Sequence, residues 1–224
     1  MQPYVSIDIE TLGLDPDYCH TIELAAVIDL DGVSPIEQLP TFQTYITRPT
    51  NQGEPYAMQM NANIMGIIAG LSEIELTNTT EQNAIKFFWN FLNNNKPKGE
   101  KRYTPAGKNY ASFDKAFLMN LQGFKQLISP MLSHRTLDPG NLYWLPREDG
   151  FVLPDTKKCL ERAGLEPTES HRALGDAIDV VRLIRHSMVN NQSTKCIKVE
   201  TVPFPPGYLK AMDKIINKSS QENY

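Results

Sequence analysis

The sequence predicts one α/β domain, built on a mixed sheet of about five strands with helices flanking it. Two patterns support this fold class. Apolar, β-branched runs with a turn signal come first along the chain, and helical patterns that alternate with short strand-like runs follow them. The 224 residues are 41% hydrophobic and 21% charged, which is typical of a globular domain that can bury a substantial core.

The first three strands are expected in the N-terminal part of the chain. Residues 3–9 and 22–30 are apolar runs, and the polar segment 11–21 between them carries turn-forming residues, so we expect a loop there. Asp31-Gly32 is a hairpin turn signal. A third, antiparallel strand is therefore expected around residues 41–47.

Loops and short helical turns are expected over residues 48–78, and a longer helix follows them. Thr79 and Gln82 have the spacing of a capping box, which marks the start of a helix. The helix after them carries apolar residues at i, i+3, i+4 and i+7, namely Ile85, Phe88, Trp89 and Leu92. This stripe is expected to face the core. The next segment is a basic linker with Lys96, Lys98, Lys101 and Arg102.

Short strands are expected at residues 103–106 and 134–137, the second being the fifth strand of the sheet. Between them, a helix over residues 113–122 is predicted to begin at Ser112 as its N-cap.

Two further helices are expected at residues 153–163 and 173–188. Pro154 is predicted in the opening turn of the first, and Gly164 just past its end. Residues 1–189 therefore form the predicted domain. Residues 190–224 contain three prolines and a polar end, and are predicted to be an extension that is docked or partly disordered.

Composition limits the classes of protein to which the chain can belong. Its net charge of −4 argues against a protein that simply coats nucleic acid, since such proteins are usually basic. The three cysteines are far apart and suggest neither a disulfide framework nor a zinc site. No apolar run approaches the length of a membrane span, and the N-terminal residues lack the pattern of a secretory signal. A cytoplasmic protein is the simplest expectation.

Carboxylates at three places in the sequence are candidates for catalysis. Asp8 and Glu10 stand two apart at the end of the first strand, so their side chains project to one side. A solvated strand end would also explain this pair. Asp114 falls in the first turn of a predicted helix, where the helix dipole alone favours an acid. Asp176 lies on an inward helix stripe, which is costly unless the acid is paired or binds a metal. Asp179, one helical turn later, is the alternative candidate for this metal-ligand role.

Three segments that contain these acids occur in order along the chain: Ser6-Ile7-Asp8-Ile9-Glu10-Thr11-Leu12-Gly13-Leu14, Ala111-Ser112-Phe113-Asp114, and His171-Arg172-Ala173-Leu174-Gly175-Asp176-Ala177. Together they resemble the three exonuclease motifs of the DEDDh class, over about residues 4–188. That class includes the proofreading subunit of bacterial replicative polymerases, RNase T and oligoribonuclease. The His five residues before the last Asp distinguishes it from the DEDDy subclass.

The resemblance implies an RNase H-like fold and a metal-dependent 3′→5′ exonuclease. Two divalent ions, Mg²⁺ or Mn²⁺, would be held by Asp8, Glu10, Asp114 and Asp176, because hard cations prefer oxygen ligands. A pair of ions about 4 Å apart can orient water and stabilise the leaving oxygen of a phosphodiester. The resemblance assigns the general base to His171, whose unperturbed pKa of about 6.5 suits that role.

The resemblance also suggests which residues contact the terminal nucleotide at a single-stranded 3′ end. These are Thr11, Leu12, Asn109 and Phe113, with Leu12 wedged against the last base. The chain has Thr-Leu-Gly where the family often has Thr-Thr-Gly, and Asn-Tyr where it often has His-Asn. These departures leave DNA and RNA both open as substrates.

Several functional alternatives follow from these patterns. The first is an exonuclease that releases nucleoside 5′-monophosphates from single-stranded DNA or short RNA, the second is an RNA-processing exoribonuclease, and the third is a non-catalytic nucleic-acid-binding module. No polymerase domain is evident, so a proofreading role would require a polymerase partner. Lys108 is a candidate phosphate contact, and the basic linker could steer a phosphate backbone or be an ordinary solvated surface. Asp138 could add a carboxylate to the site or cap the helix that follows it.

Overall fold

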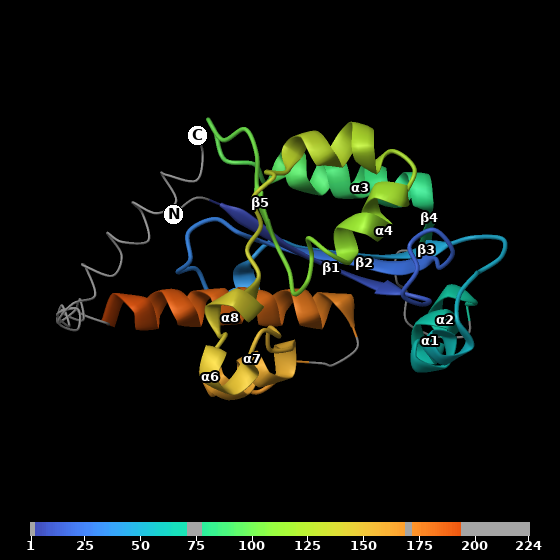
Figure 1. The fold of residues 1–224 in the computed structure, drawn as a ribbon. Helices are drawn as coiled ribbons and strands as arrows, with labels where there is room; N and C mark the ends of the chain where they lie inside the picture. Colours follow the sequence, from blue (N-terminus) through green and yellow to red (C-terminus); the bar gives the residue numbers. More distant parts are fainter. Residues whose placement is uncertain (1–2, 71–77, 169–171, 194–224) are drawn as a thin grey trace, which may run out of the picture. The chain divides into compact units, whose positions relative to one another are not determined.

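The structure, a computed structural model, describes residues 3–70, 78–168 and 172–193 (Figure 1). Its centre is a five-stranded mixed sheet in the order β4-β3-β2-β1-β5. The strands are β1 (Tyr4–Thr11), β2 (Thr21–Asp29), β3 (Thr41–Thr47), β4 (Asn78–Thr80) and β5 (Thr104–Ala106). β1, β2 and β3 pair antiparallel, whereas β4 and β5 are added parallel at the two edges. The predicted mixed α/β fold is therefore confirmed.

Helices cover both faces of this sheet. They are α1 (Pro55–Met60), α2 (Ala62–Ile68), α3 (Glu81–Asn94), α4 (Asp114–Asn120), α5 (Pro139–Leu142), α6 (Pro146–Asp149), α7 (Thr156–Ala163) and α8 (Ala173–Ser193). Short 3₁₀ or π turns lie at η1 (Ile36–Gln38), η2 (Phe124–Ile128) and η3 (Ser129–Met131). Figure 1 shows α3 and α4 on one face of the sheet and the long α8 on the other. None of the helices in the described part of the chain is long and apolar enough to cross a membrane.

The alternation of side chains along β1 divides the core between the two faces. Val5, Ile7 and Ile9 pack with residues of α3 and α4 in one cluster. Tyr4 packs with Ala177 and other residues of α8 in another cluster. Because side chains alternate with a period of two, the even-numbered residues of β1 face α8. Asp8 and Glu10 belong to this even-numbered set, which directs both carboxylates toward the helix that carries Asp176.

The predicted fifth strand is wrong in its position. Residues 134–137 form no strand, and the fifth strand is β4, which had been expected to be part of a helix start. Leu132 and Leu137 do form isolated parallel bridges with Tyr103 and Ala106. Between these bridges, four residues of one segment face two of the other, so the ladder cannot continue and residues 133–136 bulge away from the edge.

Three predicted helix starts differ from the observed ones. Thr80, not Thr79, is the N-cap of α3 and makes no side-chain capping bond, so the capping box is wrong. Ser112 does not cap α4, because its hydroxyl donates to the carbonyl of Asn109 and the N-cap is Phe113. α7 begins at Thr156, and Asp155 caps it by accepting from the Lys158 N–H at 2.8 Å, so Pro154 precedes the helix.

Other sequence predictions agree with the structure. Gly164 ends α7 with φ of 66°, a left-handed conformation that favours glycine. The predicted stripe of α3 is buried at Ile85, Phe88 and Leu92. Asp138 caps α5 by accepting from the Gly140 N–H at 2.7 Å, which is the capping alternative. Residues 194–224 lie outside the described residues, so the predicted extension stays a prediction.

Candidate metal centre

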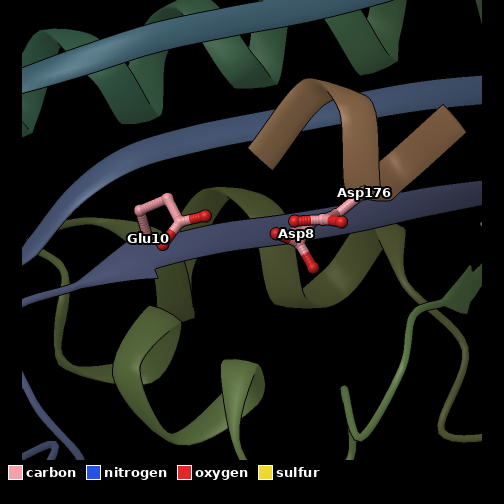
Figure 2. Close-up of side chains that lie close together, drawn as sticks. All are labelled: Asp8, Glu10 and Asp176. Atoms are coloured by element: carbon pink, nitrogen blue, oxygen red, sulfur yellow. The ribbon is translucent and has the colours of Figure 1, made fainter. Parts of the chain in front are cut away.

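Three carboxylates from two distant parts of the chain meet beside the sheet. Asp8 and Glu10 of β1 and Asp176 of α8 each offer an oxygen, and these oxygens all lie within 4.8 Å of one another. Figure 2 shows the Asp8 and Asp176 carboxylates next to each other, with Glu10 further along the same strand. All three side chains are partly buried.

Local structure explains how β1 and α8 bring these acids together. The period of two along β1 places Asp8 and Glu10 on the face that α8 covers. Asp176 lies in the first turn of α8, and Val180 and Leu183, which follow it on that helix, are fully buried. The apolar packing of α8 thus holds an acid over the sheet, as its position on the inward stripe predicted.

Asp114 lies near this group but does not join it. Its carboxylate is buried at the start of α4 and accepts hydrogen bonds from its own backbone N–H and from that of Ile9 on β1. Gly107 permits this approach of the chain, because a Cβ there would lie 2.8 Å from the Ile7 carbonyl oxygen. Asp114 is nevertheless close enough for its charge to act on both Asp8 and Glu10.

Burial and mutual repulsion disfavour the ionised form of these acids. The pKa of Asp8 is well above its usual range, mainly because of burial and then because of the charges of Asp114, Asp176 and Glu10. Burial, followed by the charges of Glu23 and Asp176, raises the pKa of Glu10 to about 7. Burial also raises the pKa of Asp114 to about 7. Each protonation relieves repulsion that a bound cation would relieve instead.

The donor set fits a divalent cation of the magnesium type. Among the residues that the structure describes, it consists of carboxylate oxygens within 4.8 Å of one another, without a nitrogen or sulfur ligand. Hard cations such as Mg²⁺ and Mn²⁺ prefer oxygen ligands of this kind. A cation would also neutralise charges that this fold otherwise holds at a cost in free energy.

Glu23 is a fifth acid at the site, and the sequence analysis missed it. It lies on β2 directly opposite Glu10, and its side chain is fully buried. Its oxygens accept hydrogen bonds from Gln43 Nε2 at 2.5 Å and from the Ala173 N–H at 3.4 Å, and the Arg172 Nε lies 3.8 Å away. The sequence did carry a signal for it, because Glu23 is an acid in the middle of an apolar strand. A charge buried there needs polar partners, which indicates a polar site nearby.

Arg172 connects this buried acid to the start of α8. Its guanidinium lies over the Tyr45 ring, with 5.6 Å between the guanidinium carbon and the ring centroid, and it donates to the Tyr45 hydroxyl. Thr168 adds a second tie, because its hydroxyl donates to the Gly175 carbonyl at 2.8 Å. The chain on both sides of residue 171 is therefore fixed by polar contacts.

Two of these acids border a cleft with a volume of about 870 Å³. Asp8 and Asp176 form part of its wall, and Lys108 and Lys157 bring positive charge to it. Asp179 also lines the cleft, but it is paired with Arg182 at 2.7 Å and accepts from the Thr168 N–H at 3.1 Å. These partners explain the burial of Asp179 without a metal.

The expected nucleotide contacts have different surroundings. The Thr11 hydroxyl donates to the Gly13 carbonyl at 2.7 Å. Phe113 is partly buried against Phe117, with ring centroids 5.0 Å apart. Asn109 is exposed, has φ of 60°, and accepts from Lys108 Nζ at 2.7 Å. His171 lies outside the described residues, so its expected role stays a prediction.

Leu12 differs from the expectation that it wedges against a base. Its side chain is fully buried and packs with Ile22, Tyr45 and Ile67 in a core cluster of its own. The most exposed large apolar side chain of this loop is Leu14, at 75%, and Tyr18 is exposed to 50%. Burial of Leu12 thus anchors the loop, whereas Leu14 near its start is exposed.

Comparison with known proteins gives matches in structure only. No model of a known family matches the sequence, and no curated protein is similar to it. The nuclease domain of 3′hExo, described as a DEDDh family member bound to rAMP, has 17% identity and a TM-score of 0.63, with coverage of 84% of this chain and 92% of that one.

Two bacterial Exonuclease I structures are also similar. The enzyme from Methylocaldum szegediense has 15% identity and a TM-score of 0.61 over 86% of this chain and 41% of its own. The E. coli enzyme in complex with a dT13 oligonucleotide has 15% identity and a TM-score of 0.61 over 86% of this chain and 42% of its own. This chain therefore spans about two fifths of the Exonuclease I chains. Its five-stranded mixed sheet flanked by helices is the RNase H-like fold of the DEDDh-family exonucleases.

Proposed function

We propose that this protein is a metal-dependent 3′→5′ exonuclease acting on single-stranded DNA or short RNA. The observation that carries the proposal is the meeting of Asp8, Glu10 and Asp176 within 4.8 Å, with Asp8 and Asp176 at the wall of a cleft. The similarity to exonuclease folds supports it, and the neighbours bound to rAMP and to dT13 support a nucleic-acid substrate of either sugar type.

The chemistry is hydrolysis of the terminal phosphodiester bond. Water attacks phosphorus, the bond to the 3′-oxygen of the preceding nucleotide breaks, and a nucleoside 5′-monophosphate leaves. Two divalent cations, Mg²⁺ or Mn²⁺, would supply the positive charge that such a reaction needs. Asp8, Glu10, Asp114 and Asp176 would hold them, and His171 would accept the proton of the attacking water.

The geometry around Asp114 suits a supporting role in this centre. Its carboxylate is fixed by two backbone N–H groups, whereas the other three acids lie in one mutual group. A carboxylate held in place by the backbone loses little conformational entropy when it binds a cation.

Leu14 replaces Leu12 as the residue proposed to contact the terminal base. An exposed apolar side chain on the loop directly after Glu10 can pack against a base without disturbing the core. Leu12 instead anchors this loop to the core. Its side chain is buried, and its carbonyl accepts a hydrogen bond from the Glu54 N–H at 2.7 Å.

Digestion of labelled oligonucleotides tests the proposal directly. Matched 20-mer DNA and RNA, labelled at the 5′ end, should shorten stepwise in Mg²⁺ or Mn²⁺ and stay intact in EDTA. Asp8→Ala should lower turnover by orders of magnitude with the fold intact, while Glu37→Ala, at an exposed acid outside the site, should keep it. Undiminished metal-dependent hydrolysis by Asp8→Ala would reject the site.

The same digestion separates the alternatives. Cleavage of RNA alone would indicate an exoribonuclease, and binding without any cleavage would indicate a non-catalytic module. The five residues expected to perform catalysis, Asp8, Glu10, Asp114, His171 and Asp176, are all present in the sequence. Their joint presence favours an enzyme over a module that has lost its chemistry.

A further inference from the structure

A basic groove lies along the β5 edge of the sheet, outside the metal centre. Its first part has a volume of about 530 Å³ and is lined by residues 99–102 and 133–135 together with Thr104. A second part of about 410 Å³ shares Arg102 and His134 with the first and extends to Lys115 on α4. We refer to the two parts together as the edge groove.

The bulge at the sheet edge shapes this groove. Leu132 and Leu137 bridge to Tyr103 and Ala106, so the segment between them has two residues more than β5 can pair. The surplus pushes His134 and Arg135 outward, and both side chains are exposed. Bulges commonly redirect side chains at sheet edges. Here the bulge brings Arg135 beside Lys101 and Arg102 at the start of β5.

The cations of the edge groove are not paired with acids in the part of the chain that the structure describes. Lys101, Arg102, Lys115 and Arg135 form no ion pair within the described part of the chain, and Glu100 is the one acid in the lining of either part. The described arginines of α7 and α8, by contrast, are all ion-paired. In a protein with a net charge of −4, this is a local positive field that is free to attract an anion.

The edge groove lies close to the candidate metal centre. Lys115, which lines the groove, directly follows Asp114 in α4, and the charge of Asp114 acts on Tyr110, which also lines the groove. Thr104 at the other end faces Tyr4 of β1 in register, four residues before Asp8. At about 3.3 Å per residue, that end lies roughly 13 Å from the acids along the strand. One nucleotide cannot reach both places, whereas a strand of several nucleotides can.

We propose that the edge groove binds the phosphate backbone of the single-stranded nucleic acid, several nucleotides upstream of the 3′ end at the metal centre. This proposal rests on the proposed function. Its cations neutralise phosphates, and the partly buried Met119 with exposed Pro130 provides apolar surface for bases. The groove would therefore increase affinity for long strands and have no effect on a substrate of one nucleotide.

Charge reversal in the edge groove tests this. The variant K101E/R102E/R135E is compared with K86E/K125E/R147E, which reverses three exposed cations outside the groove and changes the net charge by the same amount. Binding of a fluorescent 20-mer is measured by anisotropy in EDTA over a range of salt concentrations. Hydrolysis in Mg²⁺ is measured on the 20-mer and on the p-nitrophenyl ester of thymidine 5′-monophosphate.

The groove variant should bind the 20-mer at least about tenfold more weakly at low salt. Its slope of log affinity against log salt should fall by about 2, since each single-strand phosphate contact contributes about 0.7. Its KM for the 20-mer should rise, while hydrolysis of the small ester stays within about twofold. Loss of affinity in both triple variants alike, or unchanged binding and salt slope in the groove variant, would overturn the proposal.

Two further measurements keep the outcomes separate. Thermal unfolding shows whether each variant is folded. If the triple variant does not fold, the single variant R135E is used instead, and its salt slope should fall by about 0.7, which corresponds to one phosphate contact. If the wild type binds the 20-mer through the groove but hydrolyses neither substrate, the exonuclease proposal fails and the groove stands. If it hydrolyses both and the groove variant binds normally, only the groove fails.

Discussion

Replacing Glu10 with glutamine should stabilise the metal-free protein at alkaline pH. In the folded state, burial and the charges of Glu23 and Asp176 raise the pKa of Glu10 from 4.5 to about 7. The folded state thus holds the proton more tightly than the unfolded chain does. The stability that this carboxyl contributes is complete below about pH 4.5 and is lost as the pH rises through about 7.

The size of the effect follows from the shift in pKa. A rise from 4.5 to about 7 corresponds to roughly 3 kcal/mol, at about 1.4 kcal/mol per unit. A neutral glutamine avoids this cost. In EDTA, Glu10→Gln should therefore raise the free energy of unfolding by about 3 kcal/mol at pH 8 but by less than about 1 kcal/mol at pH 5.

Urea unfolding followed by circular dichroism at pH 5 and pH 8 measures this difference. Glu37→Gln, at an exposed carboxyl outside the site, is the matched control and should change little. Saturating Mg²⁺ should remove most of this difference at pH 8, because a cation at 100 times its Kd stabilises the wild type by about 2.7 kcal/mol, whereas the variant lacks one of the coordinating carboxylates. If Glu10→Gln gained nothing at pH 8, or gained equally at both pH values, the electrostatic account would be refuted.

Three other predictions concern catalysis and packing. His171→Ala should lower turnover by about 10²–10⁴-fold and flatten its rise between pH 5.5 and 7.5, and a full rate at pH 7 would remove the histidine from the mechanism. Leu14→Ala should raise the KM for oligonucleotides with little change in the melting temperature, whereas Leu12→Ala should cost about 2–5 kcal/mol of stability; the opposite pattern would contradict their assignment. Arg172→Met should cost about 3 kcal/mol by leaving Glu23 without its cation, and adding Glu23→Gln should recover much of that loss in a double-mutant cycle.

Much of the fold was predictable because its signals are local. The apolar runs and the Asp-Gly turn predicted β1, β2 and β3, and the helical stripe predicted the buried face of α3. Helix starts were less predictable, since several polar residues near each start could have acted as the cap. The short strand expected at residues 103–106 is present as β5, but β4 was missed and the strand expected at residues 134–137 is absent, for a different reason. Pairing at a sheet edge depends on the register with a distant strand, and three residues at β4 or four near residue 135 carry too little pattern to indicate it.

The sequence alone determined which acids are available for a metal centre and that Asp8 and Glu10 share one face of a strand. Only the tertiary structure brought Asp176 to them. It also left Asp114 outside this group, with its carboxylate accepting from two backbone N–H groups, and placed Glu23 where it accepts from the N–H of Ala173 at the start of α8. It further buried Leu12 and left Leu14 exposed, and it placed in one groove four cations that form no ion pair with any residue that the structure describes. The physical reason is that alternation along a strand is local, whereas burial and the meeting of charges depend on residues that are distant in the sequence, such as Asp8 and Asp176.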